Sequence, residues 1–416
     1  MLFKLALSSL IHRKTTVILT LISLFIGITL LFAVGFIKSE AKTSFTKTVS
    51  GTDLIVGAKT SQINLLLYSI FRLGDPTSNI SWDSYEFIKN HKAVDWTVPI
   101  SLGDSHKGYR VVGTTQEYYQ LFQFGDEQKL KLKSGHFFEG PLDVVLGSEV
   151  ATKLNYSVGE LITLSHGIGQ SSFTHHDQVD FTVTGILNKT GTPVDQSLFV
   201  GLGSIELIHE QWPSDPSEKQ ELIQKYKNNT ILPQSITAAY VGLKSKSMAF
   251  VFQRQINTHE QESLMAILPG VALASLWRMV SFIEDLFMII AIFVLFATLV
   301  SLVVMLLSSL HMRKKELALL RMIGASPFFC FLLIQFESLL IVLGAIMLSF
   351  VFLLSSLTLL SEWISTQFGL YITLSQLASL ETLFVIAVIL LVSFLITLIP
   401  SVKYYKQSIM QNISKG

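Results

Sequence analysis

Four long apolar runs constrain this chain more than any other feature of its sequence. The first, residues 15–37, contains no charged residue. At about 1.5 Å per residue, a helix of this length crosses a hydrocarbon core about 30 Å thick. Comparable runs cover residues 286–310, 328–360 and 382–400. Pro400 cannot continue a hydrogen-bonded helix, so we expect it to end the last span.

The composition agrees with a membrane protein. Hydrophobic residues make up 50% of the chain and charged residues only 15%, whereas soluble domains usually contain about 25% charged residues. The net charge of +1 excludes nucleic acid as a partner, because no strongly basic surface exists to bind phosphates. The single cysteine, Cys330, excludes an intramolecular disulfide.

The first apolar run has two interpretations. Lys4, Arg13 and Lys14 precede it, as in a cleaved signal peptide. The apolar region of a signal peptide, however, covers only about 7–15 residues, and this run is longer and lacks a clear cleavage site. We therefore expect it to stay in the protein as a membrane anchor.

Lysine and arginine predict the orientation. They precede the first run, lie between the second and third runs, and follow the fourth run. Residues 361–380 contain neither. The positive-inside rule then predicts a multi-pass inner-membrane protein with both termini in the cytoplasm. The predicted segments are a cytoplasmic amphipathic N-terminus (1–14), a first span (15–37), an outer domain with helical stalk ends (38–281), a second span (282–310), a cytoplasmic segment (311–327), a third span (328–360), an outer loop (361–380), a fourth span (381–400) and a cytoplasmic tail (401–416).

The outer segment predicts an α+β domain. Its strand-like runs mostly end in glycine, and helical spacing separates several of them. We expect two lobes, with a break near residues 213–233. The stretches 38–49 and 271–285 lack glycine and proline, which favours helical stalks over flexible linkers. Strands are predicted near residues 52–58, 109–115, 143–148, 161–167, 181–187, 196–202 and 236–244, and helices at 148–155, 204–212, 216–228 and 246–260.

Residues 313–327, "RKKELALLRMIGASP", interrupt the second and third apolar runs. Leu317, Leu320 and Ile323 recur at a spacing of three, with Leu319 and Met322 beside them, so a short helix would carry an apolar stripe. Such a helix is marginal alone in water and needs a surface to bury the stripe. Membrane headgroups and a protein partner both remain open as that surface.

The end of this segment is built to turn. Gly324 suits the left-handed position that follows a helix. Ser326 suits the N-cap of the next helix, and Pro327 suits its first position. The sequence therefore predicts a short helix, a tight turn and a new helix.

The same segment resembles the signature of the FtsX-like permease domain, found in the MacB-type, lipoprotein-releasing and cell-division branches of the ABC transporters grouped as mechanotransmission systems. The opening is similar to the first span of these permeases, "LALSSLIHRKTTVILTLISLFIGITLL". The outer segment resembles the MacB-type periplasmic core domain in "SGHFFEGPLDVVLGSEVATKLNYSVGELITL" and "FTVTGILNKTGTPVDQSLFVGLGSIELI", with glycines at Gly135, Gly147, Gly159 and Gly185. The chain end, "PSVKYYKQSIMQNI", sits where the family ends its last span in a short basic helix.

The resemblance implies a permease subunit without its own motor. No GxxxxGK[ST] phosphate loop occurs in the chain, so ATP and Mg²⁺ are expected on a separate ABC ATPase and no cofactor on this chain. The family's coupling helix, which docks on that ATPase, corresponds to Glu316, Leu317, Leu319, Leu320, Arg321, Gly324, Ala325 and Ser326. Further expected partners are a second permease copy or a paralogue, and a periplasmic adaptor or substrate-binding protein. The implied function is ATP-driven conformational change that exports a substrate or extracts it from the periplasm or the outer leaflet.

Two groups of polar residues have competing interpretations. Glu337 is an intramembrane carboxylate, for which we prefer a structural role over proton or ion chemistry. His166, His175, His176 and Asp177 lie near a predicted hairpin tip and could bind zinc, which would point to a metal-supply system. Adjacent histidines on a strand face opposite sides, so a solvated polar loop is the alternative.

Two other classes of function are open to the same sequence. The chain could be a membrane sensor or scaffold that activates a periplasmic partner such as a cell-wall hydrolase, although the cell-division branch has a smaller outer domain. Catalysis by Ser165 and His166 is disfavoured, because neighbours on a strand face opposite sides. The sequence does not identify the substrate.

Overall fold

The computed structural model describes residues 2–48, 51–125, 127–166, 175–209, 215–227, 233–312, 319–320, 322–368 and 379–413. The chain divides into two compact units. The membrane unit contains Met1–Ala41, Val280–Ser365 and Ile372–Gly416. The outer unit contains Lys42–Met279 and Thr366–Tyr371.

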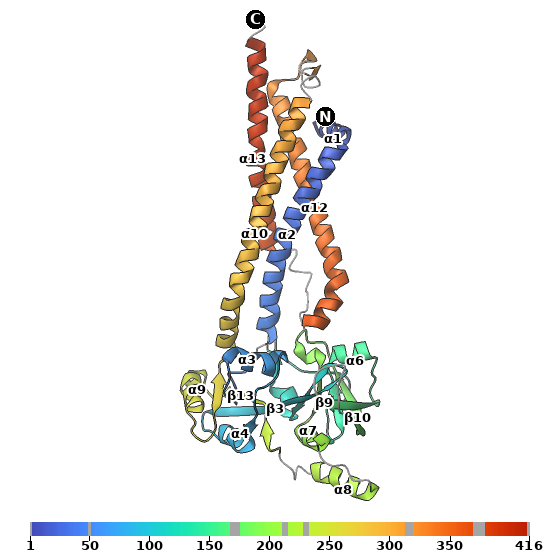
Figure 1. The fold of residues 1–416 in the computed structure, drawn as a ribbon, viewed down its shortest axis with the longest axis vertical. Coiled ribbons are helices and arrows are strands. Elements are labelled where there is room, and N and C mark those ends of the chain that lie inside the picture. The colour runs from blue at the N-terminus through green and yellow to red at the C-terminus, as the bar shows by residue number, and fades with distance from the viewer. Residues whose placement is uncertain are drawn as a thin grey trace. The chain divides into compact units, whose positions relative to one another are not determined.

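The membrane unit is a bundle of long helices (Figure 1). A short helix, α1, precedes α2, and α10, α12 and α13 complete the bundle. Four stretches are long and apolar enough to cross a membrane, which confirms the four predicted spans: Lys14–Glu40, Pro269–His311, Pro327–Ser361 and Leu380–Lys406. Both chain termini lie at one end of this bundle, here called the N/C end (Figure 1). The helix bounds are Leu2–His12 for α1, Lys14–Thr48 for α2, Pro269–Met312 for α10, Pro327–Phe368 for α12 and Leu380–Ile413 for α13.

The prediction that Pro400 ends the last span is wrong. α13 continues through Pro400 as a single helix. Around it, the hydroxyl oxygen of Thr397 lies 2.9 Å from the carbonyl oxygen of Ser393, and the hydroxyl of Ser401 donates to the carbonyl of Thr397 (2.9 Å). A proline in a helix interior costs about 3 kcal/mol. Ending the helix in a dry environment would leave several backbone groups without hydrogen-bond partners, and each of them would cost about as much as the proline does. The helix therefore continues.

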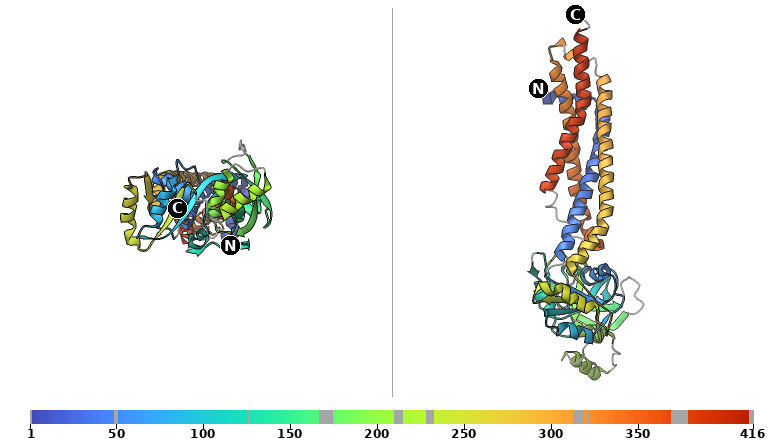
Figure 2. Two further views of the ribbon diagram at one scale, coloured as in Figure 1. Left: turned by 90° about the horizontal axis from the view of Figure 1, so that it is seen from below. Right: turned by 90° about the vertical axis from the view of Figure 1, so that its left-hand side faces the viewer.

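α2 packs closely against two other helices of the bundle. It runs beside α10 in both views (Figures 1 and 2), and a Cβ on Gly27 would lie only 3.0 Å from the Thr298 hydroxyl oxygen of α10. Towards α12, the hydroxyl of Ser349 donates to the carbonyl of Phe25 (3.2 Å), and the rings of Phe25 and Phe352 meet edge to face at 5.4 Å. Buried residues of α2 such as Leu24 contribute to a core shared by all four spans.

The outer unit is built on one mixed sheet. Among the described residues, ten strands form this sheet, in the order β14-β1-β13-β3-β4-β11-β8-β10-β7, with β9 pairing with both β10 and β3. Two short ladders, β12 with β2 and β5 with β6, lie apart from it. The strands of the main sheet are β1 Leu54–Ala58, β3 Val94–His106, β4 Tyr109–Thr114, β7 Leu132–Gly135, β8 Asp143–Leu146, β9 Leu161–His166, β10 His175–Leu187, β11 Ser197–Gly201, β13 Ala238–Leu243 and β14 Leu264–Ile267. The short ladders are β2 Ile80–Ser81, β12 Ser235–Ile236, β5 Gln123–Phe124 and β6 Gln128–Lys129.

The long strand β3 joins the two halves of this sheet (Figure 1). Residues 94–100 of β3 pair with β13, and residues 101–106 pair with β4. The first half therefore combines β1, from the start of the outer unit, with β13 and β14 from its end. The predicted break between two lobes near residues 213–233 is wrong, because one sheet joins strands from both sides of that segment, and β1 and β13 share one ladder.

Helices cover this sheet and match the predicted helical stretches. α6 Ser148–Leu154, α7 Leu202–His209, α8 Pro216–Lys227 and α9 Ala249–Asn257 lie at the four predicted positions. Three further helices were not predicted: α3 Gln62–Leu66, which continues into the π-helical turn η1 Leu67–Phe71, α4 Trp82–Lys89 and α5 Glu117–Leu121. Separate apolar cores fill the two halves, and a third core, which includes Tyr118 and Phe199, spans both. The 3-10 turns are η2 Pro193–Gln196 and η3 Lys246–Met248.

Candidate functional site at the N/C end of the helix bundle

The segment between α10 and α12 turns as its sequence predicts. Its last described residues form one helical turn, because the amide of Ile323 donates to the carbonyl of Leu319 (3.1 Å). Gly324 follows with a φ of +104°, in the left-handed region that favours glycine. The Ser326 hydroxyl then accepts a hydrogen bond from the amide of Phe329 (3.1 Å), which caps the start of α12.

The apolar side chains of this turn face away from the rest of the chain. Ile323 is 83% exposed, Met322 75% and Leu319 53%. Leu320 and Ala325 are half-buried, whereas Gly324 and Ser326 are exposed. Of the predicted coupling residues, Glu316, Leu317 and Arg321 lie outside the described residues. Large apolar side chains gathered in this way mark a surface that binds lipid or a protein partner.

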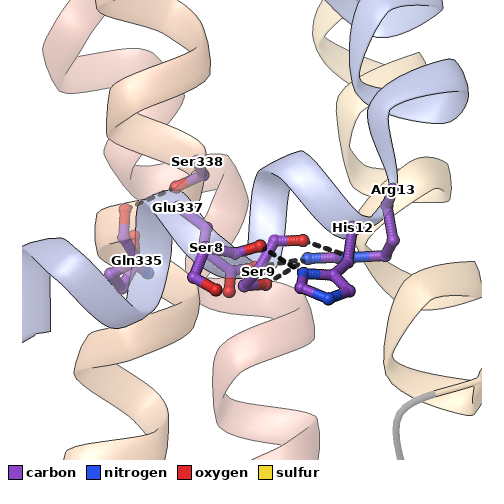
Figure 3. Close-up of polar contacts among 7 residues, drawn as sticks. All are labelled: Ser8, Ser9, His12, Arg13, Gln335, Glu337 and Ser338. Carbon is purple, nitrogen blue, oxygen red and sulfur yellow. Dashed lines mark hydrogen bonds and ion pairs between the residues drawn. The ribbon is translucent and has the colours of Figure 1, made fainter.

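The intramembrane carboxylate Glu337 has a charged partner at the joint between two other helices. Glu337 lies in α12 and is 1% exposed. A terminal nitrogen of Arg13, Nη2, lies 2.9 Å from its Oε2 (Figure 3). Arg13 occupies the single position between α1 and α2, and the same Nη2 donates to the hydroxyl of Ser9 (2.8 Å). An ion pair in a dry environment satisfies two charges that would each be costly alone.

The short helix α1 has two apolar faces at this end of the bundle. Ala6 and Leu10 are buried, while Phe3, Leu7 and Ile11 are 53%, 45% and 62% exposed at a spacing of four residues. Four-residue spacing places the exposed side chains on one face of the helix. α1 thus packs against the bundle on one side and presents an apolar stripe on the other.

A second polar cluster links α12 to α13. The hydroxyl of Thr397 donates to the side-chain oxygen of Gln335 (2.8 Å), and the hydroxyl of Ser338 donates to the carbonyl of Gln335 (2.8 Å). Figure 3 shows Gln335 and Ser338 beside Glu337 on the same stretch of α12. The first turns of α12 are therefore connected through polar side chains both to α13 and to the joint between α1 and α2.

Near the other end of α2, charged side chains again connect two helices. Nζ of Lys38 lies 3.1 Å from an oxygen of Asp285 and 3.7 Å from an oxygen of Glu284, both on α10. The side chains of Lys38 and Asp285 are 42% and 65% exposed, so solvent screens this cluster.

Sequence reasoning found Glu337 but missed its partner. Arg13 counted only as one of the basic residues flanking the first span. The two residues are separated by 324 positions, and no periodicity or motif in a single sequence connects them. The one available signal is that a charge deep in a membrane span needs a partner of opposite sign.

The predicted metal site lies outside the described side chains. β9 ends at His166 and β10 begins at His175, whose Cα pairs with that of Ser165. The side chains of His166, His175, His176 and Asp177 belong to the part of the chain that is not described, so zinc binding there stays a prediction. Elsewhere in the described ranges, no group of three or more His, Cys, Asp or Glu side chains could hold a metal ion.

Two polar side chains at or next to β9, Ser165 and His106, have structural partners. The hydroxyl of Ser165 donates to the carbonyl of Ser105 (3.2 Å), which does not favour a role as nucleophile. His106 Nδ1 lies 2.6 Å from the carbonyl of Thr163, and its Nε2 lies 2.9 Å from the hydroxyl of Tyr156. Burial lowers the pKa of His106, and nearby Lys107 lowers it further, against the opposing effect of the Thr163 carbonyl. A neutral imidazole that donates from Nδ1 and accepts at Nε2 fits this environment.

Comparisons with known proteins agree with this architecture. Residues 17–249 match the family model of the MacB-like periplasmic core domain, and residues 288–409 match that of the FtsX-like permease C-terminal domain. No curated protein sequence is significantly similar to the chain.

Two solved structures are similar to the outer part of the chain. One is the periplasmic region of MacB from Actinobacillus actinomycetemcomitans, with 10% identity and a TM-score of 0.34, covering 56% of this chain and 97% of that one. The other is the extracellular domain of the noncanonic ABC-type transporter YknZ from Gram-positive bacteria, with 13% identity and a TM-score of 0.31, covering 51% of this chain and 98% of that one.

The family assignment rests on the two family models, which cover residues 17–249, with most of the first span and of the outer unit, and residues 288–409, with most of the last three membrane helices. Their order along the chain agrees with the four apolar helices and the mixed domain between the first and second of them. The chain belongs to the FtsX- and MacB-type permeases, the membrane components of ABC transporters.

Proposed function

We propose that this chain is the subunit that converts ATP hydrolysis by a separate ABC ATPase into movement of its outer domain. The ATPase, which would bind ATP and Mg²⁺, docks on residues 313–326 in the cytoplasm. The observation that carries the proposal is the exposed apolar surface of Leu319, Met322 and Ile323 at the turn between α10 and α12.

The apolar surface of this turn is more stable when it is buried. A single exposed helical turn is not stable by itself in water. Contact of its apolar side chains with water is unfavourable, and their burial would lower the free energy. A groove on a partner protein would bury all three side chains, as amphipathic helices are recognised elsewhere. Gly324 and Ser326 support this role, because they bracket the turn and connect it to α12 without a flexible linker.

The docked segment continues into membrane helices at both ends. α12 starts at Pro327, directly after the turn, and α10 ends at Met312, just before the segment. A helix transmits displacement along its length, so force on the segment reaches α12 and α10 first. We further propose that a second copy of the permease, or a paralogue, receives the second ATPase subunit, and that the moving outer domain exports a substrate or extracts it from the periplasm or the outer leaflet.

The docking surface can be tested by the substitution Ile323→Ser. The side chain is 83% exposed, so the free energy of unfolding should change by no more than about 0.5 kcal/mol. An apolar anchor at the centre of an interface contributes about 2 kcal/mol or more, so affinity for the ATPase should fall more than about tenfold. The measurement is the ATPase activity that remains with the purified permease.

Phe250→Ser is the matched control. Phe250 lies on α9 in the outer unit and is 68% exposed, so its replacement removes a comparable apolar surface without touching residues 313–326. We expect full retention of ATPase activity. If Ile323→Ser and Phe250→Ser retained equal activity, docking at this turn would be refuted.

A further inference from the structure

The guanidinium of Arg13 connects three helices at the N/C end. Its backbone occupies the joint between α1 and α2, where the amide of Arg13 donates to the carbonyl of Leu10 (3.1 Å) and the amide of Val17 donates to the carbonyl of Arg13 (3.0 Å). Its side chain binds Ser9 of α1 and Glu337 of α12. One side chain thus contacts both α1 and α12 from the joint between α1 and α2 (Figure 3).

Glu337 is also close to the segment that we propose docks the ATPase. α12 begins at Pro327 and is helical through Phe368. At a rise of about 1.5 Å per residue, Glu337 lies about 15 Å along the helix from Pro327. This stretch contains no helix-breaking residue after Pro327, so a displacement of the turn at Gly324 moves Glu337 with it.

The two ends of α2 differ in how firmly charge holds them. The Arg13 and Glu337 side chains are 16% and 2% exposed. Near the other end, the side chain of Lys38 is 42% exposed, and those of its partners Asp285, at 3.1 Å, and Glu284, at 3.7 Å, are 65% and 17% exposed. Electrostatic attraction is several-fold stronger in a dry environment than beside water, and exposed pairs contribute little. α2 is thus held tightly at Arg13 and loosely at Lys38, about 37 Å further along the helix.

Most other contacts between α2 and α12 are apolar. Phe25 meets Phe352 edge to face, and a Cβ on Gly344 would lie 3.5 Å from Leu21. Apolar contacts resist separation of the helices but depend little on direction, since the hydrophobic effect is non-directional. An ion pair with a hydrogen bond fixes a distance and a direction, so it can transmit a pull along the helix axis.

We propose that Arg13 and Glu337 are positioning residues that form a fixed joint, through which movement of residues 313–326 passes from α12 to α2. The part of α2 around Lys38 is the part that moves relative to α10. The inference rests on the proposed function, because a docked ATPase is the source of the movement. A buried ion pair contributes little net stability compared with apolar residues of the same volume, and a role in transmission accounts for its presence in a membrane span.

The test measures a distance between the moving ends of α2 and α10. Spin labels replace Ile37 and Phe282, which are 62% and 67% exposed, in the full-length permease purified with its ATPase. Their separation is measured by pulsed electron resonance with and without a non-hydrolysable ATP analogue and Mg²⁺. Every variant is compared below the midpoint of its own thermal unfolding, so that loss of folding is not mistaken for loss of coupling.

We expect Glu337→Gln and Arg13→Gln to retain the ATPase but to lose more than half of the nucleotide-dependent change in distance. Arg13→Lys keeps a cation opposite Glu337 and should keep most of that change. Glu381→Gln removes an exposed carboxylate of α13 and should leave the change at the wild-type value. A role in stability alone would lower the unfolding midpoint of Glu337→Gln without altering the change in distance.

The outcomes separate the joint from the proposed function. A full wild-type change in Glu337→Gln, with the ATPase still bound, would refute the joint and leave docking intact. An unaltered complex that binds the ATPase but shows no change in distance would contradict the proposed function itself. A loss in Glu337→Gln and Arg13→Gln that Arg13→Lys does not share would support the joint.

Discussion

At the scale of single residues, two glycines of the outer unit both have a left-handed backbone but different surroundings. Comparing them distinguishes the cost of backbone strain from the cost of steric overlap. Gly135 and Gly74 have nearly the same φ, +77° and +76°. Gly135 ends β7 opposite Gly185 of β10, and a Cβ there would overlap the carbonyl oxygen of Thr184. Around Gly74 no heavy atom lies within 4 Å of such a Cβ. Any difference between alanine substitutions at the two sites therefore reports the close approach of β7 to β10.

We expect Gly74→Ala to cost about 1–2 kcal/mol, the penalty of a left-handed backbone with a Cβ. Gly135→Ala carries the same penalty and in addition forces the two strands apart, for a further cost of about 1–3 kcal/mol. Hydrogen exchange of the β7 and β10 amides in the full-length protein measures the loss of stability in each of the two variants. Equal losses at the two positions would show that the close approach has no energetic consequence.

For Glu337, the sequence predicts burial, but its role depends on a contact that only the tertiary structure shows. Its place in an apolar run predicts a buried carboxylate, and this is confirmed. The choice between a structural and a chemical role depends on what the carboxylate contacts. Arg13 provides a cation at 2.9 Å and favours the structural role, because removing one partner of a buried ion pair leaves the other charge unpaired.

At the scale of elements, β3 is a long strand that the sequence did not predict, and it contains Pro99. A proline argues against a central strand, since it lacks the amide that a ladder needs. In the structure, the carbonyl of Pro99 accepts a hydrogen bond from the hydroxyl of Thr114 (2.9 Å). The ring nitrogen faces the same side of the strand as this carbonyl, and backbone pairing with β4 begins only at Ser101. Pro99 therefore occupies a position where β3 passes from one half of the sheet to the other and no ladder amide is required.

The contact between α2 and α10 gives a prediction for helix packing. Gly27→Leu would overlap Thr298 and the backbone at Leu295, where a Cβ already lies at 3.0 and 3.4 Å. We expect a loss of about 1–3 kcal/mol in stability, because overpacking forces the helices apart. The midpoint of thermal unfolding of the protein in detergent measures the effect.

Gly35→Leu on the same helix is the control for this prediction. No heavy atom lies within 4 Å of a Cβ on Gly35, and leucine is a better helix former than glycine by nearly 1 kcal/mol. The midpoint of Gly35→Leu should stay the same or rise. A fall of similar size in both variants would mean that Gly27 matters for helix flexibility and not for contact with α10.

At the scale of the whole molecule, the distribution of basic residues predicts which side of the membrane each unit occupies. The prediction places both termini in the cytoplasm and the outer unit in the periplasm. Both termini lie at one end of the bundle (Figure 1), as four membrane crossings require. The compartment that this end faces is predicted only from the distribution of lysine and arginine.

Site-directed labelling answers this question. The single cysteine, Cys330, is buried and can be replaced by serine. In that background, cysteine is introduced at the exposed positions Lys403 and Phe250 and treated with a maleimide that does not cross membranes. We expect the label on Phe250→Cys in intact spheroplasts and on Lys403→Cys only in inverted vesicles, with both reacting in detergent. The opposite pattern would reverse the assigned orientation.

From the amino-acid sequence we could predict the four spans, the turn at Gly324 and Ser326, and seven strands and four α-helices of the described outer unit. These features depend on residues close together in the chain: apolar length, capping chemistry and local periodicity. Only the tertiary structure decided the partner of Glu337, the continuation of α13 through Pro400 and the passage of β3 between two halves of one sheet. Each of these depends on contacts between distant segments or on a balance of backbone hydrogen bonds, and a single sequence contains no record of which distant groups meet.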